Sequence, residues 1–238
     1  MSTAAESIVE ILLEMGDAEK VSGVTRFFKA EKGGYAEGDQ FLGISVPQQR
    51  AIAKKHYKEI ELAEVVKLLK NPFHEVRLTA LFFLVYQYEK ESIDEQEKIV
   101  RVYLQNVSSI NNWDLVDSSA DKILGAWLYA HPKKEILYKL AVSDNLWERR
   151  ISIIASFYFI RKKVFTDALA ISKILLNDKH DLIHKAVGWM LREIGNRDFE
   201  AAFEFLKQHY AQMPRTMLRY AIEKFEETLR QKFLKGMI

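Results

Sequence analysis

Asn112-Trp-Asp-Leu-Val-Asp117 is the segment most informative about the fold, because its pattern recurs along the chain. The pattern opens with a polar residue or proline, places a charged residue early in a predicted helix and leads into an apolar run. Four other segments have the same form: Asn71–Arg77, Asp144–Arg150, Asp181–Lys185 and Pro214–Arg219. The charged positions are 40, 33, 35 and 34 residues apart. That interval is the length of a two-helix repeat, so the sequence predicts a curved α-solenoid built from helical pairs.

Residues between these segments also favour helices. Apolar side chains recur at intervals of three and four, as at Val187, Met190, Leu191 and Ile194, and no long alternating stretch indicates strands. Glycine and proline are scarce, with 10 and 4 among 238 residues, and each proline stands where a helix should begin. We therefore expect an all-α protein. The predicted helices cover residues 3–15, 18–30, 47–57, 61–70, 72–89, 93–107, 112–130, 133–142, 145–162, 165–177, 181–196, 198–211 and 214–233.

The composition indicates a folded protein, since 48% of the residues are hydrophobic. Linkers are short apart from the irregular, glycine-containing segment at 31–46, so residues 1–238 are expected to form a single domain. The absence of cysteine excludes disulfides and thiolate metal sites and fits a reducing compartment. The longest apolar runs, Leu78–Val85 and Ile151–Ile160, are too short to cross a bilayer, and the N-terminus lacks a basic start. We expect a cytoplasmic protein.

The charges of the repeated segments form a series: Arg77, Asp117, Arg150, Lys185 and Arg219. Equivalent positions of a solenoid line up along one face, so this charged series predicts a basic strip, able to follow a phosphate backbone, that is interrupted by one acid. The strip matters because the net charge is only +2, with 35 basic and 33 acidic residues. The alternative is structural, with each arginine paired to a carboxylate of a neighbouring repeat.

Tryptophans accompany the charged series. Trp113 lies four residues before Asp117, and Trp189 lies four residues after Lys185, so each pair shares one helical face. An indole one turn from a carboxylate suits a surface that holds a cation or a cationic transition state. The alternative is ordinary packing, and among the tryptophans we expect Trp147 to be the most buried.

Four segments together carry a resemblance to a known family: Gly38–Arg50, Trp113–Asp117, Ser143–Arg150 and Lys185–Glu193. They stand in family order and extend over most of the chain. On these segments the sequence resembles the AlkD-type DNA alkylation repair proteins, which are HEAT-like-repeat DNA glycosylases.

The resemblance implies excision of positively charged N3- and N7-alkylated purines from duplex DNA, as a monofunctional base-excision-repair glycosylase. It places the catalytic carboxylate at Asp117, the two tryptophans that flank the sugar at Trp113 and Trp189, and a phosphate-binding arginine at Arg150. Phe27 falls at a DNA-binding position where some members have a tyrosine. The family engages the sugar and backbone without a base-flipping pocket. Neither a cofactor nor a metal is implied, and duplex DNA is the expected partner, with no membrane and no obligate protein partner.

Alternatives remain open at the level of sequence. A non-catalytic repeat protein could bind damaged or unusual DNA, and a protein-interaction scaffold would present an apolar concave groove. From the charged series, Arg77, Lys185 and Arg219 are candidate contacts to the DNA backbone. His180 and His184 have the spacing of a zinc-binding helix, but no third ligand is apparent, so we predict no metal site.

Overall fold

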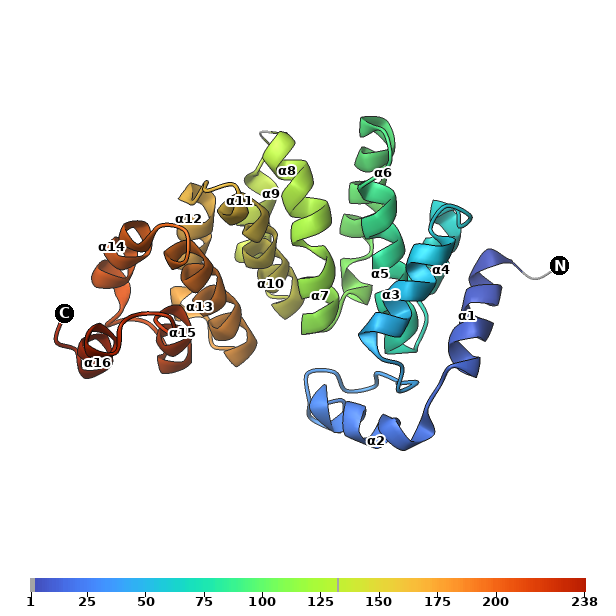
Figure 1. Cartoon of the computed structure of the whole chain (residues 1–238), viewed down its shortest axis with the longest axis horizontal. Helices are drawn as coiled ribbons and strands as arrows, with labels where there is room; N and C mark the ends of the chain where they lie inside the picture. Colours follow the sequence, from blue (N-terminus) through green and yellow to red (C-terminus); the bar gives the residue numbers. More distant parts are fainter. Residues whose placement is uncertain (1–2, 132) are drawn as a thin grey trace. The chain divides into compact units, whose positions relative to one another are not determined.

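The computed structural model describes residues 3–131 and 133–238. Every regular element in these two ranges is helical, and the one strand-like feature is an isolated bridge between Gln40 and Phe73 (Figure 1). The prediction of an all-α protein is therefore confirmed. Pro132, predicted to stand at a helix start, lies outside the described residues.

The chain divides into two compact units, Met1–Ser119 and Ala120–Ile238. Each has its own buried apolar core. A single domain and one continuous solenoid stay predictions.

Unit 1 is built around one buried helix, α5 (His74–Tyr88). The apolar run Leu78–Val85 makes this helix hydrophobic on all sides, which is typical of a helix surrounded by others. It packs against α1, α3, α4, α6 and α7, and Figure 1 shows α3 and α4 alongside it. The other elements are α1 (Ala4–Glu14), α2 (Ala18–Phe27), α3 (Val46–His56), α4 (Leu62–Leu69), α6 (Ile93–Gln105), a 3₁₀ turn (Val107–Ser109) and α7 (Trp113–Ser119).

The predicted irregular segment connects α2 to α3 and is pinned to α5. Buried Glu75 accepts hydrogen bonds from the backbone N–H groups of Leu42 and Gly43, at 3.0 and 2.9 Å. Gly43 has φ +79°, and a Cβ there would lie 2.4 Å from the Asp17 carbonyl oxygen, so the turn requires glycine. This anchoring fixes the loop beside the start of α5.

Unit 2 is organised around α13 (Asp181–Gly195), which packs against α10 (Leu146–Ala155), α14 (Phe199–His209) and α15 (Arg215–Ala221). Helices α13 and α15 approach closely at Gly188, where an added Cβ would lie 2.5 Å from the Met217 carbonyl oxygen. The other elements are a π-helical turn (Asp121–Gly125), α8 (Ala126–Ala130), α9 (Glu135–Ala141), α11 (Phe157–Arg161), α12 (Thr166–Ile174), a 3₁₀ turn (Leu175–Asn177) and α16 (Glu227–Lys235).

Three predicted helices are interrupted. The helix predicted at 214–233 is two helices, because the Glu226 carboxylate caps α16 by accepting from the backbone N–H of Leu229 at 3.3 Å, which starts a new helix there. Residues 112–130 contain the π turn, in which the Gly125 N–H donates to the carbonyl five residues earlier. Residues 145–162 are divided at Ser156, between α10 and α11.

A hydrogen bond that recurs at helix starts supports the repeat and corrects its alignment. Arg77 Nη1 donates to the carbonyls five and six residues earlier, both at 3.0 Å. Arg149 does the same at 2.9 Å, and His184 Nε2 lies 2.5 Å from the carbonyl six residues earlier. Each of the three is the fourth residue of its helix. The other members of the charged series are fifth residues, so Arg77 is equivalent to Arg149 and does not belong to the series.

Candidate functional site

Trp113 and Asp117 lie on α7, one turn apart, and both are half-buried. The backbone N–H of Trp113 donates a hydrogen bond to Asn112 Oδ1 at 2.8 Å. This satisfies one of the backbone donors that have no partner within the helix at its start. The helix therefore presents an indole and a carboxylate on a shared, partly accessible face, as the spacing predicts.

Trp113 belongs to an aromatic layer formed with Phe27, Phe28 and Phe41. The Phe28 ring stacks on Trp113 at 5.4 Å and 28°, and on Phe41 at 5.4 Å and 10°. Phe27 meets the indole edge-on at 5.7 Å and is 64% exposed. The layer holds the indole between neighbouring rings, so its orientation is fixed by packing and not by hydrogen bonds alone.

A buried imidazole lies against this layer. The His74 ring centroid is 4.8 Å from Phe28 and 5.1 Å from Phe41. Its Nε2 lies 2.8 Å from Asp114 Oδ2, and its Nδ1 lies 3.3 Å from Asp39 Oδ2. Burial lowers the pKa of His74, but the hydrogen bonds to Asp114 and Asp39 outweigh it and raise the pKa to about 9.

Arg77 completes this buried charge network of His74, Arg77, Asp39 and Asp114. It is 5% exposed, and its Nη2 donates to Asp39 Oδ1 at 2.7 Å and to the Asn111 side chain at 3.2 Å. Burial raises the pKa of Asp39, but the hydrogen bond from His74 and the positive charge of Arg77 produce a net lowering. Both terminal nitrogens of the guanidinium donate to protein acceptors and the side chain is buried, so Arg77 fits the structural alternative of an arginine paired with a carboxylate.

In unit 2, Trp189 is half-buried on α13 and contacts Phe157 at 5.6 Å. Its Nε1 donates to Glu193 Oε1 at 3.3 Å, and Arg197 donates to Glu193 Oε2 at 2.7 Å. Arg161 lies 4.7 Å from the Phe157 ring and also pairs with the buried Asp121 at 2.6 Å. These contacts hold the Trp189 indole in one orientation, and two arginines paired with acids lie near it.

The remaining predicted residues differ in accessibility. Arg150 is 4% exposed and donates to the Leu182 carbonyl at the start of α13. Lys185 is half-buried and lies 2.7 Å from Asp181, whereas Arg219 is exposed in the last turn of α15. Because Arg150 is buried, its position favours a role in fixing the start of α13 over direct contact with a DNA phosphate. Lys185 and Arg219 are the members of the charged series whose cationic groups are accessible.

Trp147 is 8% exposed, whereas Trp113, Trp127 and Trp189 are half-buried, which confirms the prediction that Trp147 is the most buried tryptophan. The sequence interpretation missed His74, Asp39 and Phe28 as supports of Trp113. The adjacent Phe27–Phe28 pair is the one signal that could have indicated an aromatic layer. The contact between Phe157 and Trp189 was not predicted from the sequence either.

The histidine pair of α13 serves the helix start. His180 Nδ1 accepts the Leu182 N–H at 3.1 Å, while His184 bonds to a backbone carbonyl. Among residues 3–131 and 133–238, no three His, Cys, Asp or Glu side chains are grouped so that they could hold a metal ion. Over the same residues, no helix combines the length and the apolar character needed to cross a membrane.

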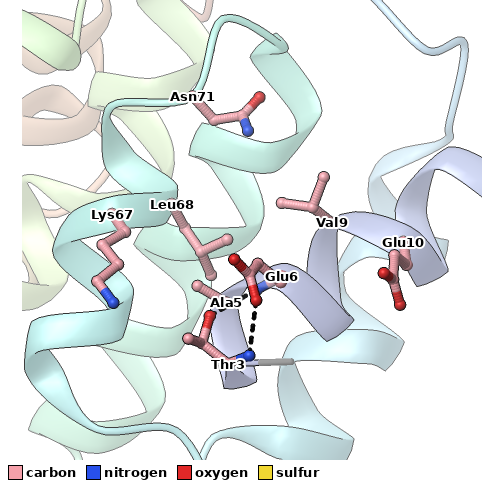
Figure 2. A pocket seen from close by; sticks show the side chains of 8 residues that line it. All are labelled: Thr3, Ala5, Glu6, Val9, Glu10, Lys67, Leu68 and Asn71. Atoms are coloured by element: carbon pink, nitrogen blue, oxygen red, sulfur yellow. Dashed lines mark hydrogen bonds between the residues drawn. The ribbon is translucent and has the colours of Figure 1, made fainter. Parts of the chain in front are cut away.

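A pocket of about 400 Å³ lies at α1 and the end of α4, and contains none of the predicted site residues (Figure 2). Figure 2 shows Thr3 and Glu6 beside it, joined by the capping hydrogen bond from the Thr3 N–H to Glu6 Oε2 at 2.7 Å. Its position at a helix cap separates it from the Trp113 face.

Three solved structures resemble the chain, each at 18% sequence identity. A predicted DNA alkylation repair enzyme from Enterococcus faecalis has a TM-score of 0.70 over 89% of this chain and 97% of its own. The smu.31 protein of Streptococcus mutans UA159 has a TM-score of 0.56 over 90% and 98%. AlkD2 from Streptococcus mutans has a TM-score of 0.55 over 87% and 97%. These likenesses show the fold.

No curated protein matches the sequence. The family described as DNA alkylation repair enzyme matches residues 8–225, which include both units' tryptophan faces. Because this match extends over nearly the whole chain, the protein belongs to the DNA alkylation repair enzyme family.

Proposed function

We propose that this protein is a DNA glycosylase that hydrolyses the N-glycosidic bond of positively charged N3- and N7-alkylated purines in duplex DNA. Family membership supports a role in DNA alkylation repair. The observation that carries the proposal is the pairing of a half-buried indole and a half-buried carboxylate, Trp113 and Asp117, on one face of α7.

The chemistry needs little beyond a fixed carboxylate. Alkylation places a positive charge on the purine, so the base leaves as a neutral molecule when it takes the electron pair of the glycosidic bond. The sugar is left with oxocarbenium character, as in glycoside hydrolysis. Water then adds at C1′ and releases one proton. In this proposal Asp117 stabilises the sugar cation, orients the water and accepts that proton.

Trp113 is proposed to face the cationic sugar beside Asp117, and Trp189 is proposed as a further aromatic contact to the DNA. An indole face attracts a cation by about 0.5–2 kcal/mol, depending on how far water is excluded. Trp113 is held by ring stacking on Phe28, and Trp189 by its hydrogen bond to Glu193 and by contact with Phe157. Both indoles are therefore already held in one orientation before DNA binds. The cation–π attraction of Trp113 can then stabilise the transition state without a further cost of ordering the side chain.

Accessible residues are proposed to bind the DNA backbone. Lys185, Arg219 and the exposed Phe27 are the candidates for this role, because each presents surface to solvent. Arg77 and Arg150 are proposed instead to order the helix starts that carry the site, because both are buried. A net charge of only +2 is compatible with this interface, since few phosphate contacts suffice when they are gathered on one surface.

The test is base release from methylated duplex DNA by the wild-type protein, Asp117→Asn and the matched control Asp94→Asn, an exposed acid in the first turn of α6. We expect release by the wild type and by the control, with a loss of about 100-fold or more in Asp117→Asn. No release by a folded wild-type protein that still binds DNA in a salt-dependent way would support the non-catalytic alternative. Equal release by Asp117→Asn would remove Asp117 from the mechanism, and absence of DNA binding at low salt would favour the scaffold.

A further inference from the structure

The buried charge network contacts the first turn of α7, the helix that carries Trp113 and Asp117, but none of its members takes part in the proposed reaction. We propose that His74 is a positioning residue: as an imidazolium held between Asp39 and Asp114, it fixes the first turn of α7 and thereby the orientation of Trp113 and Asp117. This inference rests on the proposed glycosylase function, which it deepens.

The geometry requires a doubly protonated ring. Asp39 and Asp114 are acceptors when ionised, and each faces a different nitrogen of His74, so both nitrogens must donate. All three side chains are buried, with 2% of His74 exposed. If the ring lost one proton, a nitrogen lone pair would face a carboxylate in the interior, where an unsatisfied polar group is expensive.

The network joins three segments that are distant in sequence. Asp39 lies in the pinned loop, His74 is the first residue of α5, and Asp114 is the second residue of α7. The backbone of His74 strengthens the link, because its N–H donates to the Gln40 carbonyl at 2.8 Å. The ion pairs therefore determine where α7 begins relative to α5.

Two routes connect His74 to the proposed site. Asp114 Oδ1 accepts the Leu115 N–H at 2.8 Å while Oδ2 accepts from His74, so one carboxylate ties the α7 backbone to the imidazolium. The ring of His74 also packs on Phe28, which stacks on Trp113. A change at His74 would therefore reach Trp113 through the helix backbone and through the aromatic layer.

Charged groups face His74 from the loop before α3, from α5 and from α7. Asp39 from the loop and Asp114 from α7 favour the imidazolium, while Arg77 on α5 opposes it. Glu75 on α5 accepts hydrogen bonds from the Leu42 and Gly43 N–H groups, and Phe28, the residue after α2, is uncharged. The pKa of about 9 leaves the ring charged at neutral pH. Alkaline solution should break the network before other parts of unit 1 are affected.

The experiment compares the deprotonation of His74 with the environment of Trp113 and with the rate of base release. The His74 titration is measured by ¹⁵N NMR of histidine-labelled protein, and the Trp113 environment by ¹⁹F NMR of 5-fluorotryptophan protein, assigned with Trp113→Phe. Base release from N3-methyladenine duplex DNA is measured at pH 6–10.5. We expect His74 to be protonated at pH 7.5, and the Trp113 resonance and the release rate to change together near the pKa of His74.

Variants separate positioning from general stability. Asp39→Asn removes one carboxylate far from α7 in sequence, so it should lower the pKa of His74 and move the alkaline fall in release by the same number of pH units. His74→Gln should abolish that fall and reduce release about 10-fold over the whole range. His56→Gln, which replaces a half-buried histidine paired with the exposed Glu59, should match the wild type.

Distinct outcomes would overturn the inference. It fails if His74 is neutral at pH 7.5, if Asp39→Asn moves the pKa of His74 but not the alkaline fall, or if His74→Gln releases base like His56→Gln. If the wild type releases no base, the proposed function fails. The ¹⁹F titration then still decides whether His74 positions Trp113.

Discussion

Trp113 and Trp189 have the same local design, an indole with a carboxylate four residues later, but different support. Trp113 precedes Asp117 and is held by stacked rings over a buried charge network. Trp189 precedes Glu193, which accepts its indole N–H and pairs with Arg197. Helical spacing from a tryptophan therefore does not by itself make a carboxylate catalytic or structural, because that role depends on which groups surround the carboxylate.

The largest expected effect is on the rate of base release, and it should differ between variants of Asp117 and of Glu193. Asp117→Asn should reduce release of alkylated purines by about 100-fold or more, because the charge beside the developing sugar cation is lost. Glu193→Gln should reduce it by about 10-fold or less, because glutamine can still accept from the Trp189 indole. Single-turnover assays with saturating enzyme measure both. Equal losses would mean that the two acids share one task.

A smaller effect concerns stability against pH. The pKa of His74 is raised on folding from 6.5 to about 9, so its stabilising contribution is fully present below pH 6.5 and is lost as the pH rises through 9. A shift of this size corresponds to on the order of 3 kcal/mol. Urea unfolding at pH 6 and pH 9.5 measures it, with His74→Gln as the variant that should lack the difference. An equally steep loss in that variant would assign the pH dependence to other groups.

The next effect tests packing behind Trp189. Gly188→Ala should destabilise the protein by about 1–3 kcal/mol, because the new Cβ would meet the Met217 carbonyl and the Tyr220 Cβ at 2.5 Å. Gly195→Ala is the matched control on the same helix, where the nearest atoms are 3.4 and 3.6 Å away. It should be neutral or stabilising by up to about 1 kcal/mol. Thermal unfolding of both variants measures the difference, and similar stabilities would show that α15 can move away.

The smallest effect concerns the exposed end of the charged series. Arg219→Gln should leave stability unchanged and reduce the slope of log affinity against log salt by about one, as expected for one lost phosphate contact. Lys207→Gln removes an exposed cation of α14 outside the series and should keep the wild-type slope. Fluorescence anisotropy with duplex DNA at several salt concentrations measures both. Identical slopes in the two variants would exclude Arg219 from the interface.

Helical periodicity predicted most elements because it depends on local spacing, and the start of α13 at Asp181 matches the predicted residue. The break between α15 and α16 was missed, since it depends on the Glu226 cap and not on hydrophobic pattern. The alignment of Arg77 was wrong by one position. Charge identity suggested Arg150 as its equivalent, whereas hydrogen bonding to the preceding turn identifies Arg149.

The all-α class and the common face of Trp113 and Asp117 could be predicted from the amino-acid sequence, because both follow from interactions within a few residues. The enclosure of His74 by Asp39 and Asp114 depends on the tertiary fold, since these partners are 35 and 40 residues away from it in the chain. Tertiary structure also decided that Arg77 is buried and Arg219 exposed. Burial and ion pairing depend on which distant segments meet, and they determine whether a charged side chain supports the protein or faces its substrate.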